Sequence, residues 1–263
     1  VRVCEKKYPE AVRVLKASQA ADPARSWNAM WMFQARCQAN FMAGRTHRMQ
    51  DAVTELDRAI SLQPDNAHAY AWRSRVLKHM TLLRPALEDI KQALRLSPDY
   101  LWALAVRGNL HSELGLFPQA LADCAELVSR CPDKAWAWAQ SSRVKARCVP
   151  SRSMLECLAE LDKAVELEPA SSIYLAWRGE VLRILGRTKE AEADFRRSLK
   201  MAPRYPLTLM WLAKLRLLEG DVEDAAHLLD EAMPELGGNV LAASYRWQAR
   251  LCAGRFEKAV EDY

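Results

Sequence analysis

The sequence predicts an all-α solenoid of antiparallel helix pairs, and two regularities predict it. Proline recurs with spacings of 34, 34, 37 and 34 residues, each time after a stretch with helical periodicity, at Pro64, Pro98, Pro132, Pro169 and Pro203. Small residues precede these prolines by twelve positions, at Ala52, Ala86, Ala120, Cys157 and Ala191. A period of this length is typical of a stacked repeat array, and small side chains at a fixed offset suit helices whose backbones approach closely.

Each repeat is expected to contain two helices joined by a short turn. Between Ser172 and Pro203, the pattern predicts a first helix over 173–185, a turn at Gly186-Arg187 and a second helix over 189–201. Glycine occupies the position where the first helix must stop in most repeats, at Gly44, Gly115, Gly186, Gly220 and Gly254. We expect a positive φ at these glycines, because a left-handed residue commonly ends a helix.

The whole chain, 1–263, is expected to form one array. Its repeats are predicted in order at 1–25 (half a repeat), 26–66, 67–100, 101–134, 135–171, 172–205, 206–239 and 240–263 (truncated). The repeat before Pro169 carries three extra residues, which we place in the turn over 147–152. The repeat before Pro64 is seven residues longer, and either a longer helix over 27–43 or a loop over 24–28 accounts for them.

Two segments carry the same short motif. The residues are Arg107-Gly108, Gly115, Phe117, Ala120 and Pro132, and then Arg178-Gly179, Gly186, Ala191, Phe195 and Pro203. With these residues the chain resembles the tetratricopeptide repeat (TPR) family, in its variant with Arg-Gly in the first helix, over nearly its whole length. The resemblance implies a right-handed superhelical solenoid whose concave groove binds peptides or protein segments.

Arginine and aspartate recur sixteen residues apart. The pairs are Arg73 with Asp89, Arg107 with Asp123, Arg178 with Asp194 and Arg246 with Asp262, and Arg36 with Glu55 once three extra residues are allowed for. Where leucine replaces the arginine, at Leu212, the partner position holds Leu228. This covariation within one chain predicts a contact between the two helices of a repeat. Ser141 and Glu160 depart from the pattern.

Aromatic residues recur on one face of the first helices. They lie thirteen residues before the turn (Trp31, Trp102, and Trp136 once the insertion is counted) or nine residues before it (Trp72, Trp177, Trp211 and Tyr245). These two positions are one helical turn apart and therefore share a face, which in TPR proteins lines the groove. Alternatively, the tryptophans pack between successive first helices and stiffen the array.

Mostly basic side chains share that face. They are His68, Arg75, Lys78, His79, Asn109, Glu113, Gln140, Arg143, Arg147, Glu180, Arg183 and Lys214. Cations interleaved with aromatic rings can stack on apolar groups and pair with carboxylates. The sequence therefore predicts a protein-interaction scaffold that binds an extended, acidic or aromatic segment in a tryptophan-lined, net basic groove.

Composition limits the other functions. The net charge of +5 is mild, the seven cysteines form no C-x-x-C motif, and no motif of a catalytic, metal or phosphate site is present. We expect a cytoplasmic protein without catalytic residues, cofactor, metal or membrane association. Because the chain starts without Met and stops inside a helical pattern, the partner surface could also meet the remainder of a longer parent chain. Two alternatives remain open, a regulatory or sensor segment of a larger multidomain enzyme, and an RNA-binding helical repeat, although the charge does not favour nucleic acid.

Overall fold

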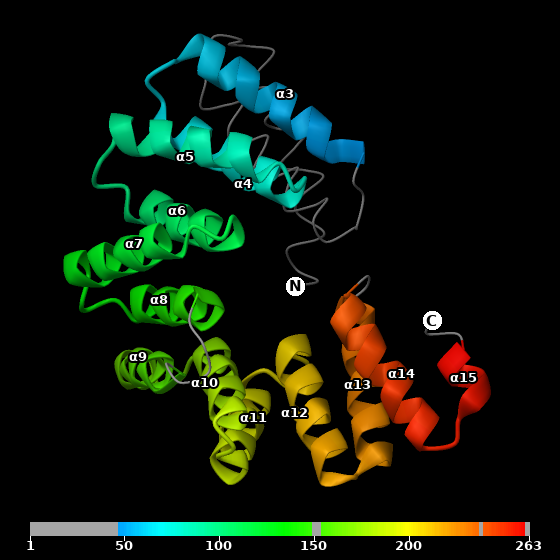
Figure 1. The fold of residues 1–263 in the computed structure, drawn as a ribbon. Coiled ribbons are helices and arrows are strands. Elements are labelled where there is room, and N and C mark those ends of the chain that lie inside the picture. The colour runs from blue at the N-terminus through cyan, green and yellow to red at the C-terminus, as the bar shows by residue number, and fades with distance from the viewer. Residues whose placement is uncertain (1–46, 149–153, 237–238, 261–263) are drawn as a thin grey trace. The chain divides into compact units, whose positions relative to one another are not determined.

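The computed structural model describes residues 47–148, 154–236 and 239–260, and within these ranges it contains helices and no strand (Figure 1). Most helices pack against the next helix along the chain. The predicted all-α fold of paired helices is confirmed. The choice between a longer helix over 27–43 and a loop over 24–28 lies outside the described residues, as does most of the turn over 147–152.

The chain divides into two compact units, one ending at Leu127 and the other beginning at Val128. The first unit contains α3 (His47–Leu62), α4 (Ala67–His79), α5 (Leu83–Leu96), α6 (Leu101–Glu113) and most of α7 (Phe117–Arg130). The second unit contains α8 (Ala135–Cys148), α9 (Met154–Leu167), α10 (Ser172–Ile184), α11 (Thr188–Met201), α12 (Pro206–Glu219), α13 (Val222–Leu236), α14 (Val240–Cys252) and α15 (Phe256–Val260). We call α4, α6, α8, α10, α12 and α14 the first helices, and α3, α5, α7, α9, α11, α13 and α15 the second helices.

First helices also contact each other within a unit. α4 touches α6 in the first unit, and in the second unit α12 touches both α10 and α14. Side chains of neighbouring first helices therefore adjoin one another. We call the surface that they form the first-helix face, which includes Trp72 and Trp102 in the first unit and Trp177, Trp211 and Tyr245 in the second.

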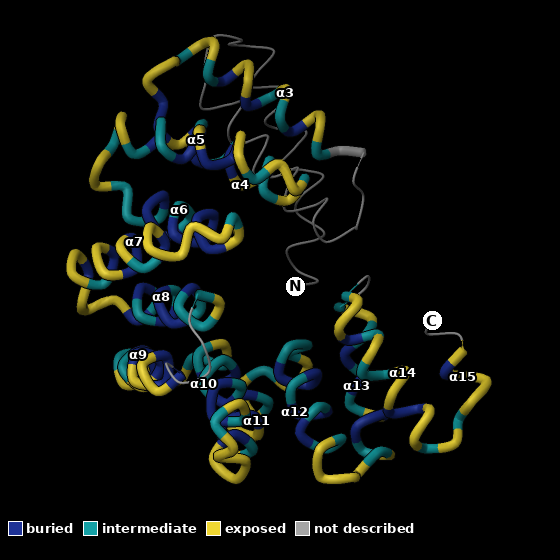
Figure 2. Tube along the Cα trace, viewed as in Figure 1, coloured by how far each residue is buried: buried dark blue, intermediate teal, exposed yellow. Residues whose placement is uncertain are grey.

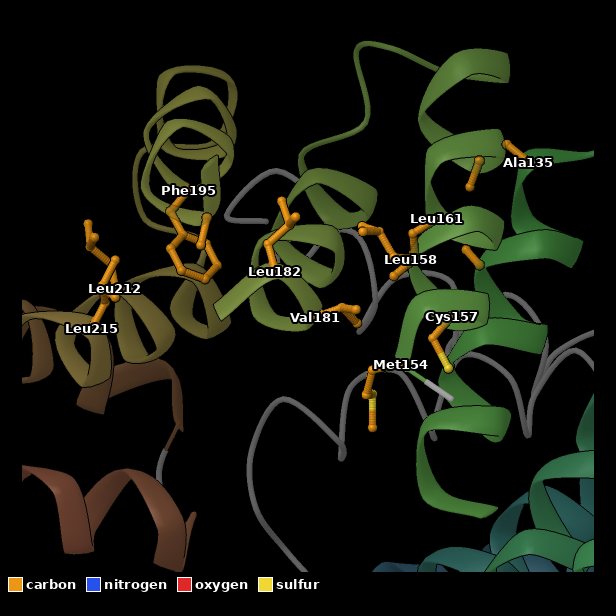
Figure 3. Packing of buried hydrophobic residues seen from close by; sticks show 13 residues of the cluster. Ala135, Met154, Cys157, Leu158, Leu161, Val181, Leu182, Phe195, Leu212 and Leu215 are labelled. Carbon is orange, nitrogen blue, oxygen red and sulfur yellow. The ribbon is translucent and has the colours of Figure 1, made fainter. Parts of the chain in front are cut away.

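The close crossings depend on small residues. Ala86, Ala191 and Cys157 are fully buried, and Figure 2 shows buried positions recurring along the helices. Phe195 of α11 is fully buried among Leu182, Leu212 and Leu215, as Figure 3 shows. Its ring lies so near Gly179 of α10 that a Cβ added there would stand 2.6 Å from the ring's Cε1 atom. Gly179, the glycine of the second Arg-Gly motif, therefore leaves room for this ring because it has no side chain.

Left-handed glycines follow α6, α10, α12 and α14, as predicted, whereas Gly44 lies outside the described residues. Gly115, Gly186, Gly220 and Gly254 have φ between 70° and 86°. In each turn the next N–H donates to the carbonyl five residues back, for example Arg187 N to Leu182 O at 2.9 Å. Thr81 takes the equivalent place after α4 with φ of 63°, although a β-branched residue is strained in this region.

The expected arginine–aspartate contacts are present wherever both residues are described. Arg73 donates from Nε and Nη2 to the two carboxylate oxygens of Asp89, at 2.7 and 2.6 Å. Arg178 forms the same two bonds with Asp194, at 2.7 and 2.8 Å. These bonds raise the pKa of Arg178 above its ordinary value, although burial opposes the rise.

The arginines do more than join the two helices of one repeat. Nη1 of Arg73 also reaches Asp57 of α3 at 2.7 Å, and Nη1 of Arg178 reaches Asp162 of α9 at 3.0 Å. Both aspartates lie sixteen residues before their arginine, in the preceding second helix. The interpretation of these pairs as contacts confined to one repeat is therefore too narrow, because the planar guanidinium has enough donors to bridge two second helices.

Other repeats vary this contact. Arg107 and His111 share the carboxylate of Asp123, at 2.9 Å from Arg107 Nε and 2.7 Å from His111 Nδ1. Glu160 accepts a bond from Ser141 at 2.9 Å and is paired with Lys145 at 2.7 Å, so a lysine one turn later replaces the arginine. Leu212 and Leu228 belong to one apolar cluster. Arg36 and Asp262 lie outside the described residues.

Candidate functional site: the first-helix face

Aromatic rings form a continuous chain on the first-helix face of the first unit. His68 of α4 lies edge-on to Tyr100 at 4.6 Å between ring centroids, and Tyr100 lies 5.8 Å from Trp102 of α6. Trp102 in turn lies 5.7 Å from Trp72 of α4. These separations fall in the range of favourable aromatic pairs. The two tryptophans therefore contact each other across successive first helices.

The same tryptophans remain partly accessible. Trp72 packs against the apolar cluster between α3 and α4, and Trp102 packs against the cluster shared by α4, α5 and α6. Both are half-buried. Each of these two rings therefore packs against an apolar cluster and keeps part of its surface exposed.

Basic residues occupy the C-terminal half of α4. The exposed guanidinium of Arg75 stands 5.2 Å from the centroid of the Trp72 ring. Lys78 is paired with Glu113 of α6 at 2.8 Å. Burial lowers the pKa of the neighbouring His79, and the charges of Arg75 and Lys78 lower it further. This end of α4 thus places the exposed Arg75 next to the ring chain, while the charge of Lys78 is balanced by Glu113.

Two predicted residues do not join this group. Asn109 is 5% exposed, and its amide donates to the Ala105 carbonyl one turn earlier at 2.9 Å. Trp31 lies outside the described residues.

The second unit places cations on rings of neighbouring helices. Arg143 of α8 stands 5.5 Å from the ring centroid of Trp177 on α10, and Lys214 of α12 stands 5.0 Å from the ring of Tyr245 on α14. All four side chains are half-buried. A cation over a ring face is attracted by the ring's quadrupole while it keeps its full charge.

Arg183 of α10 is in a different setting. Its Nε and Nη2 atoms donate to the two carboxylate oxygens of Glu180 at 2.7 and 2.8 Å, and only 9% of its side chain is exposed. The hydrogen bonds to Glu180 raise the pKa of Arg183, and burial opposes them. The charge of Arg183 is therefore compensated within its own helix, in contrast to that of Lys214.

The remaining predicted residues are spread over the second unit. Trp211 of α12 is half-buried between two apolar clusters, one towards α10 and one towards α14. Trp136 of α8 is half-buried, and Arg147 at the end of the same helix is exposed.

Sequence reasoning missed two tyrosines. Tyr100 joins the ring chain of the first unit. Tyr205 stands immediately before α12, where burial raises the pKa of its phenol and the charge of Arg143 partly offsets that rise. Both tyrosines follow a period proline by two residues, at Pro98 and Pro203. That shared offset was the signal that could have found them.

Within the described residues, no three His, Cys, Asp or Glu side chains are grouped so that they could hold a metal ion. No helix among them is both long and apolar enough to cross a bilayer.

Comparison with known proteins finds a family whose model matches part of the chain. Residues 182–244, which run from the last three residues of α10 to the first five of α14, match the family model of the tetratricopeptide repeat. This segment of the chain matches a tetratricopeptide repeat. A comparison with curated proteins finds no match.

Solved TPR structures share the fold. A tetratricopeptide repeat protein from Parabacteroides merdae is 17% identical, with a TM-score of 0.73 over 94% of each chain. A thermophilic TPR protein from Thermus thermophilus is 22% identical, with a TM-score of 0.63 over 70% of this chain and 99% of its own. Yeast Tom70 is 14% identical, with a TM-score of 0.68 over 95% of this chain and 60% of its own. At these identities the likeness is one of fold.

Proposed function

We propose that this TPR array is a protein-interaction scaffold that binds an extended protein segment carrying acidic and aromatic side chains on its first-helix face. Helical repeats present long continuous surfaces, and such surfaces commonly bind other proteins. The observation that carries the proposal is the seating of cations over partly exposed rings, Arg75 over Trp72, Arg143 over Trp177 and Lys214 over Tyr245.

Rings and cations contribute differently to such binding. Half-buried tryptophans provide a large apolar area at little entropic cost, and Trp and Arg are enriched among the residues that dominate interface energies. A cation held on a ring is oriented before the ligand arrives, so less side-chain freedom is lost when it meets a carboxylate. The basic face also speeds the approach of an acidic segment. These properties favour a ligand with alternating acidic and aromatic residues.

The test is selection of peptides from a random displayed library by the immobilised chain. We expect the selected peptides to be enriched in Asp or Glu together with Trp, Tyr or Phe. Binding of a selected peptide should fall by about tenfold or more with Trp102→Ala or Arg75→Glu, as expected for residues at the centre of an interface. Arg75 is exposed, so its reversal should leave the melting temperature unchanged.

Arg84→Glu provides the matched control. Arg84 is an exposed arginine in the same unit, but it lies on the second helix α5. Its reversal changes the net charge as much as Arg75→Glu does and should leave peptide binding intact. Selection of peptides without acidic residues, or equal losses from the two reversals, would contradict the proposed site.

A further inference from the structure

Helices α12 and α14 together hold a lysine whose charge is not balanced by a carboxylate. Lys214 of α12 is half-buried, and its ammonium group stands 5.0 Å from the ring centroid of Tyr245 on α14. Among the described residues, no carboxylate lies within ion-pair distance of this ammonium group. The ring fixes the position of Lys214 but leaves its charge intact, because the quadrupole of a ring carries no net charge.

A neighbouring cation of the same face is in the opposite situation. Arg183 of α10 donates from Nε and Nη2 to the two carboxylate oxygens of Glu180. A ligand carboxylate placed beside Arg183 would find these donors occupied and would meet the negative charge of Glu180. Of these two cations, Lys214 is therefore the one that an acidic ligand can pair with.

Tyr245 supplies a second donor beside the ammonium group. Its ring packs against the apolar cluster shared by α12, α13 and α14, which holds the side chain in place. Its hydroxyl makes no hydrogen bond to another described residue. A phenol donates one hydrogen bond, and the two oxygens of a carboxylate can accept from separate donors. Lys214 and the Tyr245 hydroxyl can therefore bind one carboxylate together, through charge-assisted hydrogen bonds.

Exposed leucines flank this donor pair. Leu218 follows Lys214 by four residues on α12 and is 68% exposed, and Leu241 precedes Tyr245 by four residues on α14 and is 50% exposed. Residues four apart share a face of a helix, so both leucines belong to the first-helix face. In a stack of antiparallel helix pairs, successive first helices run in the same direction. The two leucines therefore lie on opposite sides of the donors.

The spacing of these residues fits an extended segment. Each leucine lies one helical turn from a donor residue, which is about 6 Å along the helix axis. An extended chain covers that distance in about two residues, and its side chains at alternate positions point to the same side. An acidic residue with an aliphatic residue two positions before it and another two positions after it therefore presents all three side chains to this surface.

We propose that the α12–α14 part of the first-helix face binds the side-chain carboxylate of one internal acidic residue, held by Lys214 and the Tyr245 hydroxyl, between two aliphatic residues that pack on Leu218 and Leu241. The inference rests on the proposed function and specifies the ligand at this end of the face. The aliphatic contacts favour binding because they remove apolar surface from water. The ion pair gives specificity, because a neutral residue would leave the half-buried ammonium group without a partner.

The experiment measures fluorescence anisotropy of labelled peptides with the full chain. The first peptide has the core Leu-Ser-Glu-Ser-Leu with both ends blocked, and the second has glutamine in place of the glutamate. The third is truncated to Leu-Ser-Gly and ends in a free C-terminal carboxylate. We expect the first peptide to bind about tenfold more tightly than either of the others, as a hydrogen-bonded charge pair contributes. Equal affinities of the first and second peptides, or tighter binding of the third, would overturn the inference.

Variants assign the effect to the two donors. Lys214→Gln should weaken the first peptide by about tenfold and leave the second unchanged, because only the first carries the carboxylate. Tyr245→Phe keeps the ring and should weaken the first peptide by about threefold through loss of the hydroxyl. Lys189→Gln, at an exposed lysine on the second helix α11, is the matched control and should leave both peptides unchanged. Equal responses to Lys214→Gln and Lys189→Gln would show that only net charge matters and would contradict the site.

Leu218→Ser tests the aliphatic contact. It should weaken the first and second peptides alike by about threefold, because both present the same leucines. Leu155→Ser is the matched control, since Leu155 is 62% exposed and lies on the second helix α9. Equal effects of the two changes would show that the leucines of the ligand do not pack here. If library peptides depend on Arg75 and Trp102 but the first peptide does not depend on Lys214, this inference fails while the proposed function stands.

Discussion

The helix pairs α4–α5 and α10–α11 are equivalent elements that differ by 105 positions, and they keep one set of residues while changing another. Arg73 and Arg178 make the same bridges to two second helices, and Trp72 and Trp177 occupy the same place on the face. On that face, however, Arg75 corresponds to Glu180. The interior contacts define the fold, and the outward positions are where the two pairs become chemically different.

The interior differs in one respect as well. Gly179 admits the Phe195 ring in α10–α11, whereas α4–α5 has Ser74 and Ile90 at the corresponding positions. The turn after α10 has Gly186 at a positive φ, and the turn after α4 has Thr81. The two helix pairs therefore keep the same contacts with different residues at the helix crossing and in the turn. Substitutions at these positions show how much each residue contributes to the stability of its own pair.

The largest effect is expected from breaking the buried ion pair. Asp194→Leu should lower the free energy of unfolding by about 3–5 kcal/mol, because it removes the buried partner of Arg178 and leaves only the exposed Asp162 beside the guanidinium. The double change with Arg178→Leu should recover much of this loss, as the apolar pair Leu212 and Leu228 shows that two leucines fit such positions. Chemical denaturation measures both. Equal losses in the single and double variants would mean that the contact contributes nothing.

The close crossing should give the next largest effect. Gly179→Ala should cost about 1–3 kcal/mol, since the new methyl group would overlap the Phe195 ring in a packed core. The equivalent Ser74→Ala is the control. Its hydroxyl is buried and makes no hydrogen bond, so its removal should leave stability unchanged or slightly raised. A tolerated Gly179→Ala would show that α10 and α11 can separate without loss.

The turns should respond in opposite directions. Thr81→Gly should raise the melting temperature. The left-handed conformation costs a β-branched residue about 1 kcal/mol, and glycine adopts it without this strain. Gly186→Thr should lower stability by about 1–3 kcal/mol for the same reason. Thermal unfolding of both variants sharpens the comparison, and a change of the same sign in both would contradict it.

The exposed aspartates that pair with Arg73 and Arg178 from the preceding helix should contribute least to stability, and by similar amounts. Asp57 and Asp162 have side chains that are 53% and 55% exposed, so Asp57→Asn and Asp162→Asn should each cost about 0–1 kcal/mol. High salt should reduce even that difference. A loss comparable with that of Asp194→Leu in either variant would show that the contact with the preceding repeat is as strong as the contact within the repeat.

Much of the fold was predictable because its signals are local and repeated. Proline and glycine fix where helices end through their own backbone preferences, so the boundaries of α10 and α11 were expected within a residue or so. The spacing of sixteen residues identified the contact of Arg178 with Asp194, because the same pair recurs in several repeats and two leucines replace it in one. These features follow from the chain's period alone.

The site was less predictable because side-chain pairing depends on neighbours from several helices. The face of each first helix could be read from the sequence, but the burial of Asn109, the ring contact of Tyr100 and the second bridge of Arg73 to Asp57 could not. Above all, Arg183 and Lys214 are both basic residues of one face in the sequence. Only the tertiary structure decides that the first is bonded to Glu180 and the second rests on a ring, because that outcome depends on which groups lie within a few ångströms of each cation.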